Sequence, residues 1–162
     1  MRYHDITKDD MKNGMGLRVV LWVSGCSHCC KGCQNPITWN HNSGLEFDDS
    51  AKQEIFEQLD KDYISGITLS GGDPFFMGNR EEILNLIKEI KEKYPNKTIW
   101  SYTGYEWEDV KDLEHMNYID VMLVGKFIQT MFNANAKWVG SDNQRVIDVK
   151  KSLESNEVVL YE

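Results

Sequence analysis

The four cysteines of this 162-residue chain lie in one short segment, Cys26-Ser-His-Cys29-Cys30-Lys-Gly-Cys33. Taken three at a time they give the spacings Cys26-x3-Cys30-x2-Cys33 and Cys26-x2-Cys29-x3-Cys33, and the residues alone leave both frames open. Three thiolates from one loop can hold three irons of an iron–sulfur cube, which leaves the remaining iron free to bind a substrate or a second cofactor. The spacing favours this chemistry.

Two other uses of the cysteines fit the spacing less well. A structural zinc site normally takes paired Cys-x2-Cys knuckles from two places about 12–20 residues apart. Here Cys29 and Cys30 are adjacent and their side chains would diverge, although His28 adds a donor and keeps zinc as an alternative. A catalytic dithiol usually opens a helix in a thioredoxin-like unit and does not need so many cysteines. We therefore favour an iron–sulfur cluster.

The composition of the chain limits the partners and the compartment that we expect for such a site. The chain has 18 basic and 26 acidic residues, a formal net charge of −8, so the phosphates of DNA or RNA would be repelled. No apolar run approaches the roughly 20 residues that span a bilayer, and residues 1–10 do not resemble a secretory signal. We expect a cytoplasmic protein with no nucleic-acid or membrane partner. In that compartment clustered cysteines serve metal or redox chemistry more often than disulfides.

Short apolar runs alternate with helical patterns along the chain. Residues 18–23 are rich in β-branched and aromatic side chains without polar alternation, as in a strand buried on both faces. Further strands are predicted at residues 66–69, 98–102 and 118–124, and helices at residues 51–59, 79–94 and 107–113. Residues 1–16 are expected to form an irregular lead-in, and residues 145–149 and 157–161 could each form a strand.

The repeated order of strand, loop and helix predicts an α/β fold. We expect a parallel sheet with right-handed crossover helices, arranged as an open partial (β/α) barrel, because about four or five units are too few for a closed barrel. A single domain should span residues 1–162. Asp48 and Asp49 mark the start of the first helix, and Asn79, three residues before Glu82, can cap the second.

A glycine-rich loop, Ser70-Gly-Gly-Asp-Pro74, follows the second predicted strand. Its glycines let the backbone approach a ligand closely, its carbonyls can accept hydrogen bonds from an ammonium group, and Asp73 adds negative charge. Standing alone, such a sequence is more simply a tight turn. Here it shares a predicted sheet edge with the cysteine loop, at the carboxyl ends of the strands where α/β folds collect ligands. Weaker candidates to bind a ribose or carboxylate at this edge are Ser101, Thr103 and Tyr105.

These motifs together resemble the radical S-adenosylmethionine enzymes. More closely, and over nearly its whole length, the chain resembles the activating proteins of anaerobic (class III) ribonucleoside-triphosphate reductases. The matching segments are Asn13-Gly-x-Gly-x-Arg18, Ser24-Gly-Cys-x-His28, Gly32-Cys33, Asn35-Pro-x-Thr-Trp39, Leu69-Ser-Gly-Gly-Asp-Pro74, Ile99-Trp100, Tyr102-Thr-Gly-Tyr105, Gly125-Lys-Phe127 and Gly140-Ser-x-Asn-Gln144. The CxxxCxxC motif indicates only the superfamily, whereas Thr-Gly-Tyr with Gly-Ser-x-Asn-Gln indicates this family.

The resemblance implies a set of site residues. A four-iron four-sulfur cluster would be held by Cys26, Cys30 and Cys33, with Cys29 as a spare. The second cofactor would be S-adenosyl-L-methionine. Its adenosine would lie against the backbone of Gly32, Cys33 and Gln34, and its amino group would be received by Gly71, Gly72 and Asp73. No catalytic acid or base is implied, because the cofactors carry the chemistry.

The resemblance also implies an activity. The cluster would cleave S-adenosylmethionine to methionine and a 5′-deoxyadenosyl radical, which would take a hydrogen from a glycine of the large reductase subunit and leave a glycyl radical. The expected partners are that subunit and a low-potential electron donor. Two alternatives share part of this chemistry: a radical activase of a different glycyl-radical enzyme, and a small iron–sulfur electron-transfer module.

Overall fold

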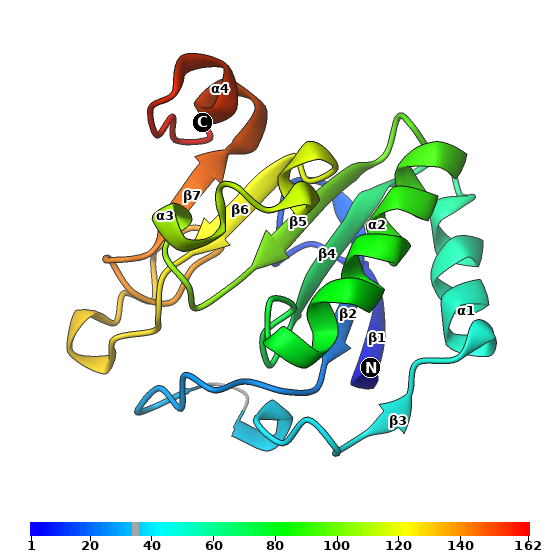
Figure 1. Ribbon diagram of the computed structural model, residues 1–162, viewed down its shortest axis with the longest axis horizontal. Helices are drawn as coiled ribbons and strands as arrows, with labels where there is room; N and C mark the ends of the chain where they lie inside the picture. The colour runs from blue at the N-terminus through cyan, green and yellow to red at the C-terminus, as the bar shows by residue number, and fades with distance from the viewer. Residues whose placement is uncertain (34–35) are drawn as a thin grey trace.

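The computed structural model describes residues 1–33 and 36–162, which form a seven-stranded sheet with helices packed on it (Figure 1). The strands lie in the order β3-β1-β2-β4-β5-β6-β7. Their bounds are β1 Arg2–Asp10, β2 Leu17–Val23, β3 Leu45–Glu46, β4 Ile64–Gly71, β5 Thr98–Tyr102, β6 Val121–Val124 and β7 Arg145–Asp148. The helices are α1 Asp49–Leu59, α2 Arg80–Lys93, α3 Trp107–Val110 and α4 Val149–Ser155, and the short 3-10 helices are η1 Pro36–Thr38, η2 Met77–Asn79, η3 Glu114–Asn117 and η4 Gln129–Met131.

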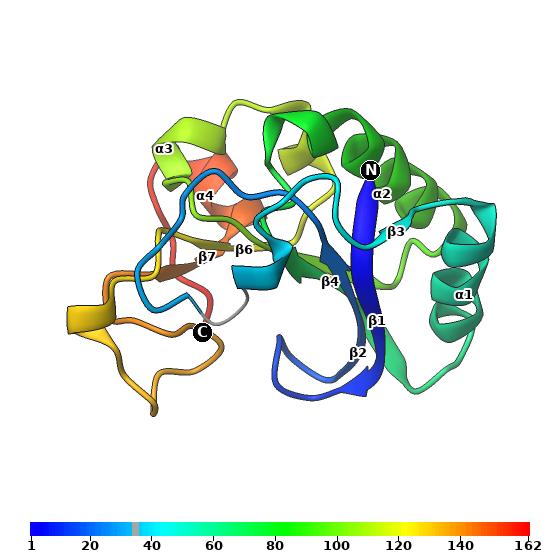
Figure 2. The ribbon, with the colours of Figure 1, turned by 90° about the horizontal axis from the view of Figure 1, so that it is seen from below.

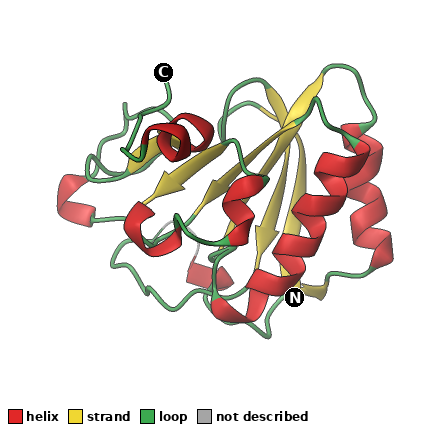
Figure 3. Ribbon diagram, turned by 45° about the horizontal axis from the view of Figure 1, so that its top comes forward, coloured by secondary structure: helices red, strands yellow, loops and turns green. Residues whose placement is uncertain are grey.

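The centre of the sheet is parallel. Strands β2, β4, β5 and β6 run in one direction, with Val23 opposite Gly71 and Leu69 opposite Ser101. This confirms the α/β class and the four predicted central strands. Their carboxyl ends therefore meet at one edge, as the two candidate loops require. The sheet is not closed, because β3 and β7 form its two outer edges (Figure 3).

The outer strands on both edges of the sheet are antiparallel to their neighbours, which corrects the expectation of a wholly parallel sheet. β1 runs antiparallel to β2 and to β3, and β7 runs antiparallel to β6. β1 comes from the residues that were expected to form an irregular lead-in. Its sequence RYHDITKDD is mostly polar, and Ile6 is its one buried residue. It is a strand because its backbone pairs with β2, where Ile6 lies opposite Leu21.

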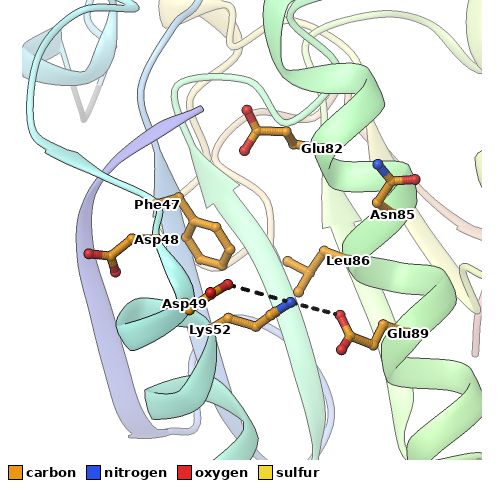
Figure 4. A pocket seen from close by; sticks show the side chains of 8 residues that line it. All are labelled: Phe47, Asp48, Asp49, Lys52, Glu82, Asn85, Leu86 and Glu89. Atoms are coloured by element: carbon orange, nitrogen blue, oxygen red, sulfur yellow. Dashed lines mark hydrogen bonds and ion pairs between the residues drawn. The ribbon is translucent and has the colours of Figure 1, made fainter.

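Helices α1 and α2 cover one face of the sheet (Figures 1 and 2). The main core lies beneath them and includes Leu21 of β2, Ile55 of α1 and Ile87 of α2, all fully buried. Lys52 joins the two helices by lying 3.1 Å from Glu89, at a hollow of about 210 Å³ (Figure 4). Among the described residues, 1–33 and 36–162, no helix has the length and apolar character needed to cross a bilayer.

A second, aromatic cluster lies on the opposite face of the sheet. The Trp100 ring centroid is 4.8 Å from that of Trp138 and 5.0 Å from that of Tyr161. Arg18 is fully buried beside Trp100, and burial lowers the pKa of its guanidinium to about 10. Its Nη2 donates to two backbone carbonyls, those of Ile67 and Thr98. The aromatic cluster and Arg18 thus stabilise the end of the central strands that lies away from the cysteines.

The C-terminal third departs most from the sequence prediction. Strand β7 confirms residues 145–148, but residues 157–161 form an isolated bridge, Leu160 with Ile147, rather than a strand. Helix α4 was not predicted; Asp148 caps it by accepting a hydrogen bond from the Lys151 N–H at 3.0 Å. The expected helix over residues 107–113 ends at Val110, and η3 follows it.

Asn79 does not cap α2 with its side chain, which corrects another expectation. Its Nδ2 instead donates to the Ser24 carbonyl at 2.8 Å, at the start of the cysteine loop, and lies 3.4 Å from the Asp73 carbonyl. The side chain is fully buried. It therefore ties the amino end of α2 to both candidate loops at the cost of a conventional helix cap.

Of the two aspartates expected at the start of α1, Asp48 is the N-cap, because its carboxylate accepts a hydrogen bond from the Ala51 N–H at 2.9 Å. Asp48→Ala should lower the free energy of unfolding by about 1 kcal/mol, because it leaves a helix N–H without this acceptor. Asp49→Ala removes charge near the same helix end but no cap, and should cost only about 0.3 kcal/mol. Urea denaturation measures both, and equal losses would contradict the assignment of Asp48 as the cap.

Candidate functional site

The cysteine loop, residues 25–33, and the glycine loop, residues 70–74, are joined at the carboxyl edge of the sheet by backbone hydrogen bonds. The Gly72 N–H donates to the Val23 carbonyl at 2.8 Å, and the Asp73 N–H donates to the Gly25 carbonyl at 2.7 Å. Gly71 has a φ of +106°, and a Cβ there would lie 2.4 Å from the Val23 nitrogen. Only glycine permits this approach without displacing β2. The structure thus brings the two predicted loops into direct contact.

The first residues of the cysteine loop also bond the segment that follows the cysteines. The Gly25 N–H donates to the Thr38 carbonyl at 2.7 Å, and the Cys26 N–H donates to the Trp39 carbonyl at 3.1 Å. A Cβ on Gly72 would lie 2.4 Å from the Gly25 carbonyl oxygen and 2.7 Å from that of Thr38. Gly25, at the start of the cysteine loop, and Thr38, beyond its end, therefore lie side by side over Gly72.

Asp73 is the centre of a buried hydrogen-bond cluster. Its carboxylate is 1% exposed, and its Oδ2 lies 2.7 Å from His28 Nε2, 3.0 Å from Thr103 Oγ1 and 2.9 Å from the Gly104 nitrogen. Its Oδ1 accepts from the Phe75 N–H at 2.8 Å. One side chain thus joins the segments that follow β2, β4 and β5. Sequence reasoning placed Asp73 at the site but did not foresee these partners.

The four cysteines differ in exposure. Cys26, Cys30 and Cys33 are partly buried, whereas Cys29 is exposed and has a positive φ of 49°; none is in a disulfide. Burial raises the pKa of the Cys26 thiol to about 11, so this thiol is neutral at neutral pH in the cluster-free chain. Binding of iron would have to displace its proton.

The donor set is compatible with a four-iron cube. In the part of the chain that the structure describes, no three His, Cys, Asp or Glu side chains converge as they would around a single metal ion. A cube does not require this, because each thiolate binds a different iron. Three partly buried cysteines on one loop, none of them in a disulfide, are the donors that such a cluster uses.

The remaining predicted residues lie as follows. Gly32 is exposed with a φ of +75°, and a Cβ there would approach the Gln129 side chain to 3.0 Å, so the loop tip lies beside η4. In Figure 2 the loop (blue) extends from β2 toward that segment (yellow). Gln34 lies outside the described residues. Thr103 bonds Asp73, whereas Ser101 is fully buried and donates to the Tyr102 carbonyl at 3.2 Å, so Ser101 does not face a ligand site.

A cavity of about 660 Å³ opens between the cysteine loop and the ends of β5 and β6. This is within the usual size range of small-molecule sites. It is lined by Ser27, His28, Cys30, Gly104, Tyr105, Glu106, Asp109, Lys126, Phe127, Ile128 and Asn143. The Cys30 thiol lies in its lining, whereas the lining of the hollow between α1 and α2 contains no cysteine.

The segment after β6 forms part of the cavity wall. No role in the site was expected of this segment from the sequence. Asn143 Nδ2 donates to the Lys126 carbonyl at 2.8 Å, and Gln144 Nε2 donates to the Gly125 carbonyl at 3.0 Å. The signal was present, because Gly125-Lys-Phe127 and Gly140-Ser-x-Asn-Gln144 are both among the matching segments of the resemblance. In the structure these two motifs bond each other and shape the cavity.

Comparison with known proteins gives the class and the family of this chain. Residues 12–147 match the family model described as a 4Fe-4S single cluster domain, which defines the class of protein. The chain is 47% identical over 146 residues to a protein of Enterobacteria phage T4, covering 90% of this chain and 93% of that one. It is 39% identical over 150 residues to a protein of Escherichia coli K12, covering 90% of this chain and 97% of that one.

A third relative, from Haemophilus influenzae, is 40% identical over 148 residues, with 89% of this chain and 96% of the relative covered. All three bear the name anaerobic ribonucleoside-triphosphate reductase-activating protein. The chain belongs to this family. The predicted resemblance to the activating proteins of anaerobic ribonucleoside-triphosphate reductases is thereby confirmed.

Proposed function

We propose that this chain is a radical S-adenosylmethionine enzyme that installs a glycyl radical on anaerobic ribonucleoside-triphosphate reductase. The observation that carries the proposal is the direct contact of the cysteine loop with the glycine loop, where the Asp73 N–H donates to the Gly25 carbonyl at 2.7 Å beside the cavity of about 660 Å³. Family membership supports the target, because the relatives are named as activating proteins of that reductase. Residues 1–162 would act as a single domain, with the open sheet as a partial barrel.

Cys26, Cys30 and Cys33 would hold the cluster. Support comes from their shared partial burial, since a cluster needs protection from solvent, whereas Cys29 is exposed. When bound, the reduced cluster supplies the electron that splits S-adenosylmethionine into methionine and a 5′-deoxyadenosyl radical. The chain's own work is to hold the thiols at one edge of the sheet and to limit the access of water.

The second cofactor would lie across both loops. Gly32, Cys33 and Gln34 would contact its adenosine, and residues 71–73 would receive its amino group. Gly71 and Gly72 are partly exposed and carry no side chain, so their backbone can approach a ligand closely. The Asp73 carboxylate already accepts hydrogen bonds through both oxygens, so we assign the direct contact with the amino group to the backbone of this loop.

The reductase would enter from the open side of the cavity. Phe127 and Ile128 line this cavity, and beyond them Met131 and Phe132 are 39% and 57% exposed. An apolar rim of this kind suits a protein substrate that completes the enclosure of the reacting glycine. A glycine can be approached at its α-carbon because it has no side chain. A low-potential donor would deliver the electron.

Anaerobic reconstitution with iron and sulfide, followed by chemical reduction and addition of S-adenosylmethionine, tests the chemistry without the reductase. We expect methionine and 5′-deoxyadenosine in equal amounts, with the hydrogen of the latter taken from the medium. A chain that carries a cluster but releases neither product would be an electron-transfer module, and the proposed chemistry would be wrong.

A further inference from the structure

We propose that His28 is a positioning residue, which uses its hydrogen bond to Asp73 to hold the cysteine loop in the shape that retains the cluster. This inference rests on the proposed cluster site. Cys26 lies two residues before His28 and Cys30 two residues after it, so the place of His28 restricts where both thiols can lie.

The hydrogen bond between His28 and Asp73 is shielded from solvent. The distance from Nε2 to Oδ2 is 2.7 Å, and the two side chains are 6% and 1% exposed. A carboxylate oxygen can only accept, so Nε2 carries the hydrogen in this contact. A shielded bond of this kind competes little with water and contributes more to local order than an exposed one.

The imidazole ring is also confined by its neighbours. Its centroid is 4.7 Å from that of Tyr105, in an edge-to-face arrangement. A Cβ on Gly104 would lie 2.4 Å from His28 Cδ2, so the ring rests directly on the backbone of that glycine. The ring thus has one position, set by the turn that follows β5. Two separable contributions hold it: the donor at Nε2 and the packing of the ring.

The anchor supplements the one at the base of the loop. Backbone bonds hold the loop at Gly25 and Cys26, before the loop extends from the sheet. His28 binds it again at a point between the first two proposed ligands, through a carboxylate that is itself fixed by Thr103 and Gly104. A second-sphere hydrogen bond that fixes ligand geometry typically changes metal affinity or activity by about 10–100-fold.

Three substitutions separate the two contributions. His28→Ala removes both. His28→Phe keeps a ring against Tyr105 and Gly104 but has no donor. His28→Gln keeps an N–H at the same number of bonds from Cβ but has no ring. His115→Phe is the matched control, because His115 is also buried, donates from Nε2 to the Arg80 carbonyl at 2.8 Å, and has an aromatic neighbour, Phe75.

The main measurement is the rate at which the reconstituted, reduced protein loses iron to a chelator under anaerobic conditions. We expect His28→Ala and His28→Phe to lose iron about 10-fold faster than the unsubstituted chain, and His28→Gln and His115→Phe to stay close to it. Loss from His28→Phe at the unsubstituted rate, or from His28→Gln at the rate of His28→Ala, would overturn the inference.

Amide hydrogen exchange over residues 26–30 of the cluster-free chain gives a second readout that needs no cofactor. His28→Phe should exchange faster there and His28→Gln should not; equal exchange in the two would also overturn the inference. The result is distinguishable from failure of the proposed function. If the unsubstituted chain takes up no iron and sulfide, the cluster proposal fails, whereas a stable cluster that His28→Phe retains equally well refutes the role of His28 alone.

Discussion

Cys30→Ala should abolish the reductive cleavage of S-adenosylmethionine, whereas Cys29→Ala should retain it. Cys30 is partly buried and lines the cavity, whereas Cys29 is exposed with a left-handed backbone, so we expect only Cys30 to bind iron. Loss of one of three protein ligands should reduce activity more than about 100-fold, beyond the usual effect of a second-sphere change. The measurement is 5′-deoxyadenosine released per chain after anaerobic reconstitution.

The pair of adjacent cysteines is its own control, because each substitution removes one thiol from the same loop. Iron and sulfide content should be measured on both variants, so that a lost cluster is distinguished from an inactive one. Should Cys29→Ala be inactive and Cys30→Ala active, the ligand frame would be Cys26-x2-Cys29-x3-Cys33, and the frame implied by the family resemblance would be wrong.

Asp73→Ala should produce the second large effect, a loss of about 3 kcal/mol in the free energy of unfolding together with loss of the reconstituted cluster. The substitution removes the acceptor of His28, Thr103 and the Gly104 N–H, all at a carboxylate that is 1% exposed. Buried donors left without an acceptor carry most of this cost. Urea denaturation of the cluster-free chain measures the stability, and iron content measures the site.

Two further variants control this result. Asp142→Ala removes an exposed carboxylate that accepts from Asn133 Nδ2 at 2.8 Å, and should cost less than about 1 kcal/mol. Asp73→Asn keeps the shape of the side chain and one acceptor oxygen, so its loss should lie between the two. A stability unchanged in Asp73→Ala would show that the carboxylate does not organise this edge of the sheet.

The central strands were predictable because they are buried on both faces. Residues 98–102 coincide with β5, and residues 18–23 fall within β2. Short runs rich in β-branched and aromatic residues can be recognised without knowledge of their neighbours in the sheet. β1 was missed because its signal is not local. Its side chains are mostly polar, and only the backbone of β2 beside it makes it a strand. α4 is short, seven residues, and carries little periodicity.

The candidate site was predictable in outline for a related reason. Loops that follow parallel strands meet at one edge, so the cysteine and glycine loops could be expected to be neighbours. The contacts within the site could not be predicted. His28 and Asp73 are 45 residues apart, Thr103 and Asp73 are 30 apart, and their pairing depends on side-chain packing. Asn79 likewise bonds Ser24, 55 residues away, rather than capping its own helix.

The chain should install a glycyl radical on anaerobic ribonucleoside-triphosphate reductase. The most direct measurement is electron paramagnetic resonance of the reduced, reconstituted chain mixed anaerobically with S-adenosylmethionine and the anaerobic reductase of the same source. We expect a glycyl-radical signal that requires all three components and is absent with Cys30→Ala. A mixture that cleaves S-adenosylmethionine yet shows no glycyl radical on the reductase would contradict it.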